Sequence, residues 1–323
     1  MFVRDLIDGH EVDQPLLVRA AEVRTKRDGG EYLKLSLGDR TGQLTAMVWD
    51  GVAALKDVCR AGCVVHVTGR HEVHPRWGAQ LAVRALRAAE PGTFSLADLL
   101  DGPPVSAERM EQDLRALVAT VQDPHLRALL DRVLGEGTRT WELYRRAPAA
   151  KVFHQAYAHG LLEHSLTVAQ GVSAMASTFP GIDRDVAVTG ALLHDIGKLE
   201  AYTTDPQAID MTDAGKLLGE IPLGYYRIRR TIEELPGFPP QTAQAVLHII
   251  LSHHGSLEHG SPVVPCTREA TLVHFIDNLG GRLGSFDRLE KELAPGASWS
   301  PFDRVLGAGA YFGPAAEPER QAA

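Results

Sequence analysis

Several absences narrow the classes of protein to which this chain of 323 residues can belong. It has only three cysteines, Cys59, Cys63 and Cys266, and no Cys-x-x-Cys pair. That count argues against a disulfide framework or a zinc knuckle and fits a reducing compartment. No stretch approaches the ~18 uninterrupted apolar residues that a membrane helix needs. Residues 1–5 lack the basic start of a secretory signal. The sequence therefore predicts a cytoplasmic protein that makes no membrane contact.

Common catalytic motifs and an excess of positive charge are also missing. The chain contains no G-x-x-x-x-G-K-[ST], no H-E-x-x-H and no G-x-S-x-G. Its 33 Lys and Arg face 41 Asp and Glu, a net charge of -8, which argues against coating nucleic acid through bulk positive charge. The charge is uneven, however. Residues 1–90 hold 13 basic against 12 acidic residues, and the remainder holds 20 against 29. The first part is thus the better platform for a polyanion.

The first part of the chain has the pattern of a small β-barrel. Apolar and polar residues alternate with period two over residues 44–48, and Gly-rich or polar turns separate the runs. Five strands with a short helix between the third and the fourth are typical of the OB-fold barrel. The predicted strands cover residues 16–23, 32–37, 44–48, 63–69 and 80–86, and the helix covers residues 53–58.

This barrel segment resembles the nucleic-acid-binding OB domains, on residues 32–42 and 46–50. Aromatic side chains interleaved with cations suit a single strand, because bases stack on the rings and phosphates pair with the charges. An alternative remains open, in which Tyr32 and Trp49 belong to the core and the charges form a solvated face. The candidate strand contacts are Lys26, Arg27, Tyr32, Lys34, Trp49, Arg76 and Trp77.

Composition changes after residue 90. Residues 91–105 are rich in proline and glycine and read as a linker. Ser106 offers a helix N-cap, and apolar residues then recur at helical spacing, so residues 106–314 are predicted to form a helical domain. Residues 315–323 read as a flexible tail. The length of the chain fits two domains of this kind.

Histidine is concentrated in the second part, where nine of the 14 lie between His154 and His274. An apolar helix runs into His194-Asp195-Ile196-Gly197-Lys198, with His164 upstream and with His253-His254 and Asp277 downstream. Imidazoles and carboxylates together suit a borderline divalent ion such as Mn²⁺, Fe²⁺, Co²⁺ or Zn²⁺. Adjacent His194 and Asp195 cannot share one helical face, so they converge only if the helix ends there, as Gly197 suggests.

The H…HD…D order of these residues resembles the HD-domain metal-dependent phosphohydrolases. Over residues 12–314 the chain is most similar to the YhaM-type 3′–5′ exoribonucleases, which join an N-terminal OB domain to a C-terminal HD domain. The similar segments are residues 160–164, 193–198, 251–255, 260–262, 276–279 and 311–312. The resemblance implies an all-β barrel followed by an all-α HD domain. It also implies a metal site of His164, His194, Asp195 and Asp277, and a second site with His253 and His254 in which Asp195 is the bridge.

One position departs from that pattern. In the segment of residues 217–221, the family usually places a histidine after the glycine, and here Glu220 follows Gly219. The histidine belongs to the second metal site. Glutamate also ligates Mn²⁺, so we expect one or two ions, with Mn²⁺ preferred and Co²⁺, Fe²⁺ or Zn²⁺ as alternatives.

Basic residues near the HD motif are candidates for phosphate binding. Lys198 follows the motif and could stabilise charge on the reacting phosphoryl group. Arg227 and Arg230 follow Glu220, and His154 precedes His164 by ten residues; all three are candidate phosphate contacts. The alternative for the arginines is a solvated helix face.

Together these features predict a metal-dependent 3′–5′ exonuclease that hydrolyses single-stranded RNA, and also single-stranded DNA, to nucleoside 5′-monophosphates. The resemblance supplies the direction and the products. Two alternatives stay open: an HD-family nucleotide phosphohydrolase or cyclic-nucleotide phosphodiesterase, and a non-catalytic single-strand binding protein. Assembly into a homo-oligomer is also left open.

Overall fold

The computed structural model describes the chain except residues 27, 75–77, 152–154, 292, 294–295 and 315–323, so the predicted tail lies outside the described residues. The chain forms two compact units. The first is Met1–Gly102 together with Asp205–Ala208, and the second holds the other residues from Pro103 onward. Among the helices that the structure describes, none is long and apolar enough to cross a membrane.

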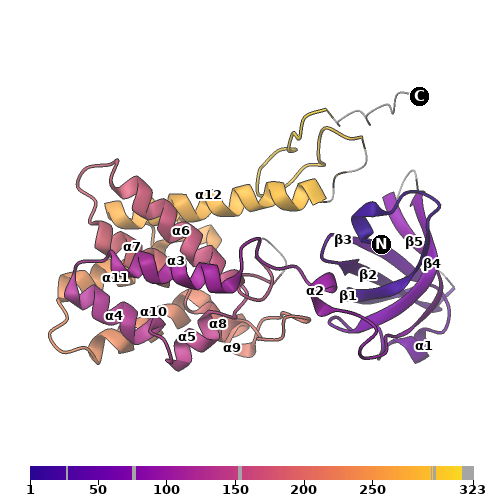
Figure 1. Ribbon diagram of the computed structural model, residues 1–323, viewed down its shortest axis with the longest axis horizontal. Coiled ribbons are helices and arrows are strands. Elements are labelled where there is room, and N and C mark those ends of the chain that lie inside the picture. Colours follow the sequence, from indigo (N-terminus) through magenta and orange to yellow (C-terminus); the bar gives the residue numbers. More distant parts are fainter. Residues whose placement is uncertain (27, 75–77, 152–154, 292, 294–295, 315–323) are drawn as a thin grey trace. The chain divides into compact units, whose positions relative to one another are not determined.

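The first unit is a closed barrel of five strands in the order β1-β2-β3-β5-β4 (Figure 1). Helix α1 lies between β3 and β4 in the chain, which is the predicted order of an OB fold. Strands β1 and β4 extend beyond their predicted ends. The elements are η1 (Val3–Asp5), β1 (Glu11–Thr25), β2 (Glu31–Asp39), β3 (Gly42–Val48), α1 (Val52–Leu55), β4 (Val64–His74), β5 (Gly78–Ala88) and α2 (Leu96–Leu99).

The alternation of the strands decides which side chains fill the barrel. Strand β2 pairs antiparallel with β3, so that Leu33 faces Val48 and Leu37 faces Leu44, and all four side chains are buried. The intervening residues, such as Lys34, therefore lie on the other face. At the irregularity of β4, a Cβ on Gly69 would lie 2.4 Å from the Ala82 oxygen, so only glycine fits there.

The second unit is built mainly of helices, and the bridges outside the named strands are isolated (Figure 1). Ser106 caps α3 as predicted, because its side chain accepts a hydrogen bond from the Arg109 N–H. The helices are α3 (Ala107–Ala119), α4 (Pro124–Leu134), α5 (Arg139–Tyr144), α6 (Gly160–Ala176), α7 (Arg184–Leu193), α8 (Lys198–Ala201), α9 (Asp213–Leu218), α10 (Glu220–Glu233), α11 (Pro240–Ser252), η2 (Leu257–His259) and α12 (Arg268–Lys291).

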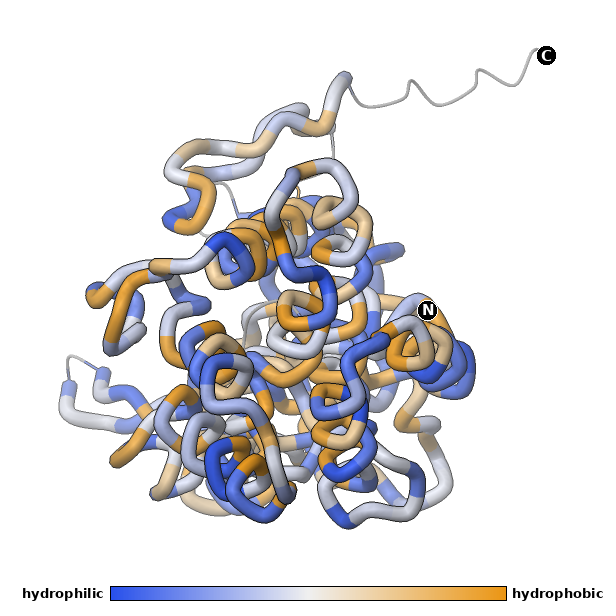
Figure 2. Tube along the Cα trace, turned by 90° about the vertical axis from the view of Figure 1, so that its left-hand side faces the viewer, coloured by the Kyte–Doolittle hydropathy of each residue, from blue (hydrophilic) through white to orange (hydrophobic). Residues whose placement is uncertain are grey.

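The core of this unit is formed by α3–α7 and α10–α12. Hydrophobic and hydrophilic residues alternate along most helices, as expected for helices with one buried face (Figure 2). Helix α7 is the exception, since its residues from Val186 to Leu193 are all buried. A Cβ on Gly190 would lie 2.3 Å from the Ile249 Cδ1 atom, so α7 and α11 approach closely at this glycine. The predicted histidine and aspartate metal ligands lie just after the ends of α7 and α11 and within α6 and α12.

Candidate metal centre and nucleic-acid face

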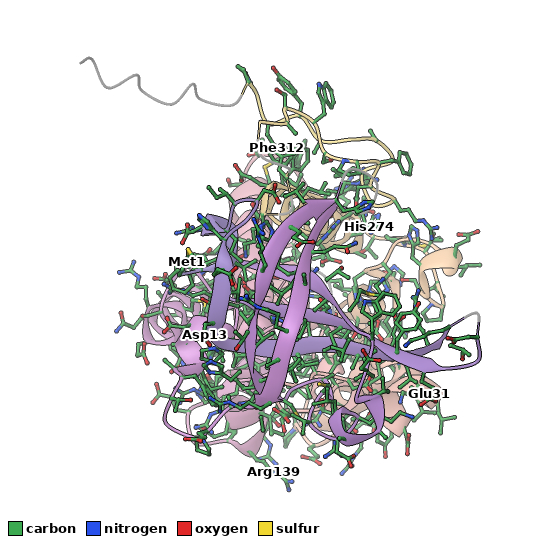
Figure 3. The ribbon with its side chains drawn as sticks, turned by 90° about the vertical axis from the view of Figure 1, so that its right-hand side faces the viewer. Met1, Asp13, Glu31, Arg139, His274 and Phe312 are labelled. Atoms are coloured by element: carbon green, nitrogen blue, oxygen red, sulfur yellow. The ribbon has the colours of Figure 1, made fainter. Side chains whose placement is uncertain are left out.

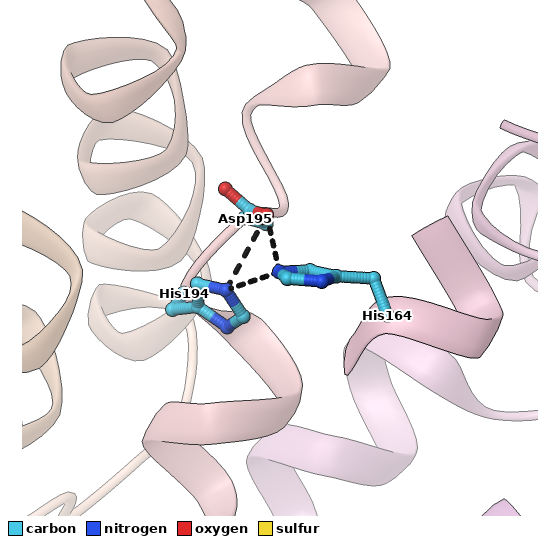
Figure 4. Close-up of side chains that lie close together, drawn as sticks. All are labelled: His164, His194 and Asp195. Carbon is cyan, nitrogen blue, oxygen red and sulfur yellow. Dashed lines mark hydrogen bonds and ion pairs between the residues drawn. The ribbon is translucent and has the colours of Figure 1, made fainter. Parts of the chain in front are cut away.

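Four predicted ligands come from three helices of the second unit. His164 lies on α6 and Asp277 on α12, while His194 and Asp195 follow α7, which ends at Leu193. The predicted helix end is therefore confirmed. Just beyond it, a Cβ on Gly197 would lie 1.9 Å from the Glu220 oxygen, so glycine is needed for the turn into α8. The turn brings His194 and Asp195 toward His164 (Figure 4).

The donor atoms of these four side chains converge on one point. The Nε2 atom of His164 lies 3.1 Å from the Nε2 atom of His194, 3.1 Å from Oδ2 of Asp195 and 3.2 Å from Oδ1 of Asp277. His194 and Asp195 are 1% exposed, and their Nε2 and Oδ2 atoms lie 3.3 Å apart. The structure thus brings together the set that the sequence predicted.

The opposite side of each imidazole explains why these nitrogens face inward. The Nδ1 atom of His164 lies 3.1 Å from the side-chain oxygen of Gln155, and that of His194 lies 2.7 Å from the main-chain oxygen of Ala191. Both oxygens can only accept, so Nδ1 carries the hydrogen and a neutral ring leaves its Nε2 bare. The two Nε2 atoms lie 3.1 Å apart and would repel each other if both were bare, so either a proton or a metal cation lies between them. The donor set therefore fits a divalent ion.

A second group of donors lies on the other side of Asp195. Its Oδ1 atom is 3.5 Å from Nε2 of His253, and within the described part of the chain both atoms are buried without a hydrogen-bond partner. His254 is adjacent, and its Nε2 atom lies 3.8 Å from Oε1 of Glu220. One carboxylate thus faces both groups, and the unpartnered atoms of Asp195 and His253 fit a second ion.

The charges of the centre support one another. Burial lowers the pKa of His164, but hydrogen bonds and charge from Asp195 and Asp277 outweigh it and raise the pKa to about 9. Burial raises the pKa of Asp277, but the neighbouring imidazoles hold it well below its usual range. The Lys198 ammonium lies 2.6 Å from Oδ2 of Asp195, and this pairing outweighs burial and raises the lysine pKa. Lys198 is therefore charged at neutral pH.

The structure places the candidate phosphate contacts elsewhere. Arg227 pairs with Glu200 at 2.7 Å, and the Arg230 guanidinium lies 5.7 Å from the Tyr226 ring centroid. Both arginines line a hollow of about 370 Å³ with Glu200 and Tyr226, and no residue of the His and Asp cluster lines this hollow. His154 lies outside the described residues.

Three of the candidate strand contacts form one cluster on the barrel. The rings of Tyr32 and Trp49 stack with centroids 4.8 Å apart, and Trp49 is 52% exposed. Lys26 lies over the Trp49 ring and donates to its main-chain oxygen at 2.8 Å. Lys34 follows on the same face of β2, whose start is marked by Glu31 in Figure 3. Arg27, Arg76 and Trp77 lie outside the described residues.

Sequence reasoning missed two groups that lie outside the donor cluster and contact its histidine residues. Gln155 reaches His164 from a loop, and the Nδ1 atom of His274 lies 2.7 Å from the main-chain oxygen of His253. A Cβ on Gly255 would lie 2.1 Å from the His274 ring, so the turn after the His pair packs directly on that ring. Chain spacing carries no signal for these contacts, because loop and main-chain geometry produce them.

Comparisons with known proteins agree with this arrangement. The family model of the HD domain matches residues 161–281, and that of the OB-fold nucleic acid binding domain matches residues 18–87. The 3′-5′ exoribonuclease YhaM of Geobacillus sp. (strain WCH70) is 30% identical over 290 residues, covering 89% of this chain and 87% of the relative. The protein of the same name from Bacillus subtilis (strain 168) is 29% identical over 289 residues, covering 89% and 90%. The HD match and the His and Asp cluster together indicate a divalent-metal centre. This chain belongs to the YhaM family.

Proposed function

We propose that this chain is a metal-dependent 3′–5′ exoribonuclease that hydrolyses phosphodiester bonds of single-stranded RNA. The observation that carries the proposal is the convergence of the donor atoms of His164, His194, Asp195 and Asp277 on one point. The relatives named 3′-5′ exoribonuclease share about 30% of their residues with the chain over 89% of its length. Nucleoside 5′-monophosphates as products, single-stranded DNA as a further substrate and a cytoplasmic location belong to the same proposal.

The proposed division of labour follows the two matched domains. Residues 1–90 hold the strand and residues 106–314 form an all-α hydrolase. Of the proposed linker, residues 91–105, the part up to Gly102 belongs to the first compact unit and includes α2. The Tyr32 and Trp49 pair and the cations Lys26 and Lys34 support a strand-holding role, because a stacked and partly exposed aromatic pair beside cations accepts any base.

Two metal sites share Asp195 in this proposal. His164, His194, Asp195 and Asp277 would hold one ion, and Asp195 with His253, His254 and Glu220 would hold the other. When bound, divalent ions supply Lewis acidity toward a phosphoryl oxygen and make water more acidic. We propose Mn²⁺ because Glu220 adds a hard oxygen donor to the second group.

Lys198 has a separate role. Its side chain is only 14% exposed and its ammonium pairs with Asp195, so it supplies a fixed positive charge where negative charge develops on the phosphoryl group. Arg227 and Arg230 are proposed to bind a phosphate of the strand farther from the reacting bond. The hollow supports this, since both arginine side chains line it.

A time course on single-stranded RNA tests the proposal. With a 5′ label and Mn²⁺, we expect stepwise shortening from the 3′ end that EDTA stops. Asp195→Asn should abolish shortening, because it removes the carboxylate that both groups share. Asp131→Asn, a matched loss of an exposed carboxylate on α4, should retain it. Absence of shortening, with hydrolysis of a model phosphodiester intact, would instead indicate a small-nucleotide phosphohydrolase.

A further inference from the structure

The four imidazoles of the proposed metal centre are held from behind in two different ways. The Nδ1 atoms of His194, His253 and His254 lie 2.7, 2.8 and 2.9 Å from main-chain oxygens. The Nδ1 atom of His164 instead lies 3.1 Å from the side-chain oxygen of Gln155. The orientation of His164 thus depends on which side chain stands at position 155. A substitution there can remove this contact and leave the main-chain hydrogen bonds of the other three imidazoles in place.

The main chain holds Gln155 in an unusual conformation. Its φ is +62°, in the left-handed region that side chains other than glycine rarely adopt, and its side chain is buried. Its main-chain oxygen accepts from the Ala149 N–H at 3.1 Å. A Cβ on Gly160 would lie only 2.1 Å from that oxygen, so the first residue of α6 must be glycine for Gln155 to occupy this place. A strained residue held by its surroundings marks a position selected for function.

The far end of the Gln155 side chain fixes which of its atoms faces His164. Burial raises the pKa of Glu163, while the Tyr157 hydroxyl, which donates to its carboxylate at 2.6 Å, and the Gln155 side chain both lower it. A carboxylate can only accept, so the amide NH₂ group of Gln155 donates to Glu163. Its amide oxygen is thereby directed to the Nδ1–H of His164.

We infer that Gln155 is a positioning residue that aims the His164 Nε2 atom into the metal centre, through a chain running from Tyr157 and Glu163 to His164. The inference rests on the proposed metal centre. Such outer hydrogen bonds fix the tautomer and ring orientation of a ligating histidine and raise its basicity, and their loss typically costs about 10–100-fold in metal affinity. Gln155 touches neither the ion nor the substrate in this account, so its effect passes through His164.

Replacement of Gln155 by methionine tests the inference. Gln155→Met keeps the length of the side chain and the backbone cost at positive φ, but it removes both hydrogen bonds. We expect Mn²⁺ binding, measured by titration calorimetry, to weaken by about 10–100-fold. The visible spectrum of the Co²⁺-loaded protein should change as well. Gln241→Met, on an exposed glutamine of α11, is the matched control and should leave both unchanged.

A second variant exchanges the donor and acceptor roles in the hydrogen-bond network between positions 155 and 163. It separates an effect on the orientation of His164 from an effect on packing. Gln155→Glu combined with Glu163→Gln keeps the net charge, since one carboxylate is gained and one is lost. The carboxylate of Glu at position 155 can accept from His164, and the amide of Gln at position 163 can donate to that carboxylate. We expect Mn²⁺ affinity near that of the unaltered protein. This double variant also decides the matter if Gln155→Met fails to fold. A third readout needs no variant: the Co²⁺-loaded protein should show a slowly exchanging, paramagnetically shifted Nδ1–H from His164.

Different outcomes refute different claims. Unchanged Mn²⁺ affinity in folded Gln155→Met, or weak binding in the folded double variant, would overturn the role of Gln155 while the metal centre stands. A fast-exchanging His164 Nδ1–H would overturn it too. Failure of the unaltered protein to bind Mn²⁺ or Co²⁺ would instead refute the proposed metal centre.

Discussion

The proton on His164 makes both stability and metal binding depend on pH. In the metal-free chain the Asp195 and Asp277 carboxylates raise the pKa of this imidazole to about 9, against 6.5 for an ordinary histidine. The folded chain therefore binds this proton more tightly than the unfolded chain does. The resulting stabilisation is complete below pH 6.5 and is lost as the pH rises through about 9.

The size of the effect follows from the difference between the two pKa values. At 1.36 kcal/mol per pKa unit, the difference is worth about 3 kcal/mol of unfolding free energy. The pKa values of His248 and His254 are lowered by burial, so these two groups add a change of opposite sign near pH 6.5. Burial raises the pKa of Cys59 to about 11, which matters only above pH 9, and the depressed Asp277 stays ionised throughout. An ion that takes the place of the His164 proton should bind about tenfold more tightly per pH unit below pH 9.

Urea unfolding of the metal-free protein between pH 6.5 and 9 measures the first effect, and Mn²⁺ titration at pH 7 and 8 measures the second. We expect the unfolding free energy to fall by up to about 3 kcal/mol over this range. His164→Ala should remove the slope, and His125→Ala, on α4, should keep it. Flat profiles in both measurements, with the fold intact, would refute the assignment of this proton.

Three further predictions concern other parts of the chain. Trp49→Ala should weaken single-stranded RNA binding by about 1–3 kcal/mol through loss of stacking, as measured by fluorescence anisotropy. Arg60→Ala on the same barrel should leave binding unchanged, and equal effects would contradict the proposed strand-binding role of Trp49. Gly190→Ala should lower the urea stability by about 1–3 kcal/mol because its Cβ would overlap Ile249, whereas Gly281→Ala, with open space in α12, should raise it; a loss in both would disagree with the packing described. Glu220→His should raise the affinity for Co²⁺ relative to Mn²⁺ in competitive titrations, because nitrogen replaces a hard oxygen donor; an unchanged ratio would place Glu220 outside the second site.

Much of the barrel and of the metal cluster could be predicted because each depends on local patterns. The period-two alternation of residues 44–48 reappears as β3, whose residues Leu44 and Val48 fill the core. Gly197 marked the helix end that lets adjacent His194 and Asp195 converge.

Contacts that depend on a distant backbone could not be predicted. Gln155 reaches His164 because Gly160 admits its main-chain oxygen, a steric relation invisible in spacing alone. Arg227 follows Glu220 by seven residues on α10, yet its guanidinium is engaged by Glu200 of the neighbouring α8. The direction of a long charged side chain is decided by whichever partner lies nearest in three dimensions.

The central claim is that one divalent ion lies among His164, His194, Asp195 and Asp277. Anomalous diffraction from crystals grown with Mn²⁺ tests it most directly. The account predicts an anomalous peak about 2.0–2.3 Å from the Nε2 atoms of both histidines and from a carboxylate oxygen of each aspartate. No peak at this position, with Mn²⁺ bound elsewhere on the chain or not at all, would contradict it.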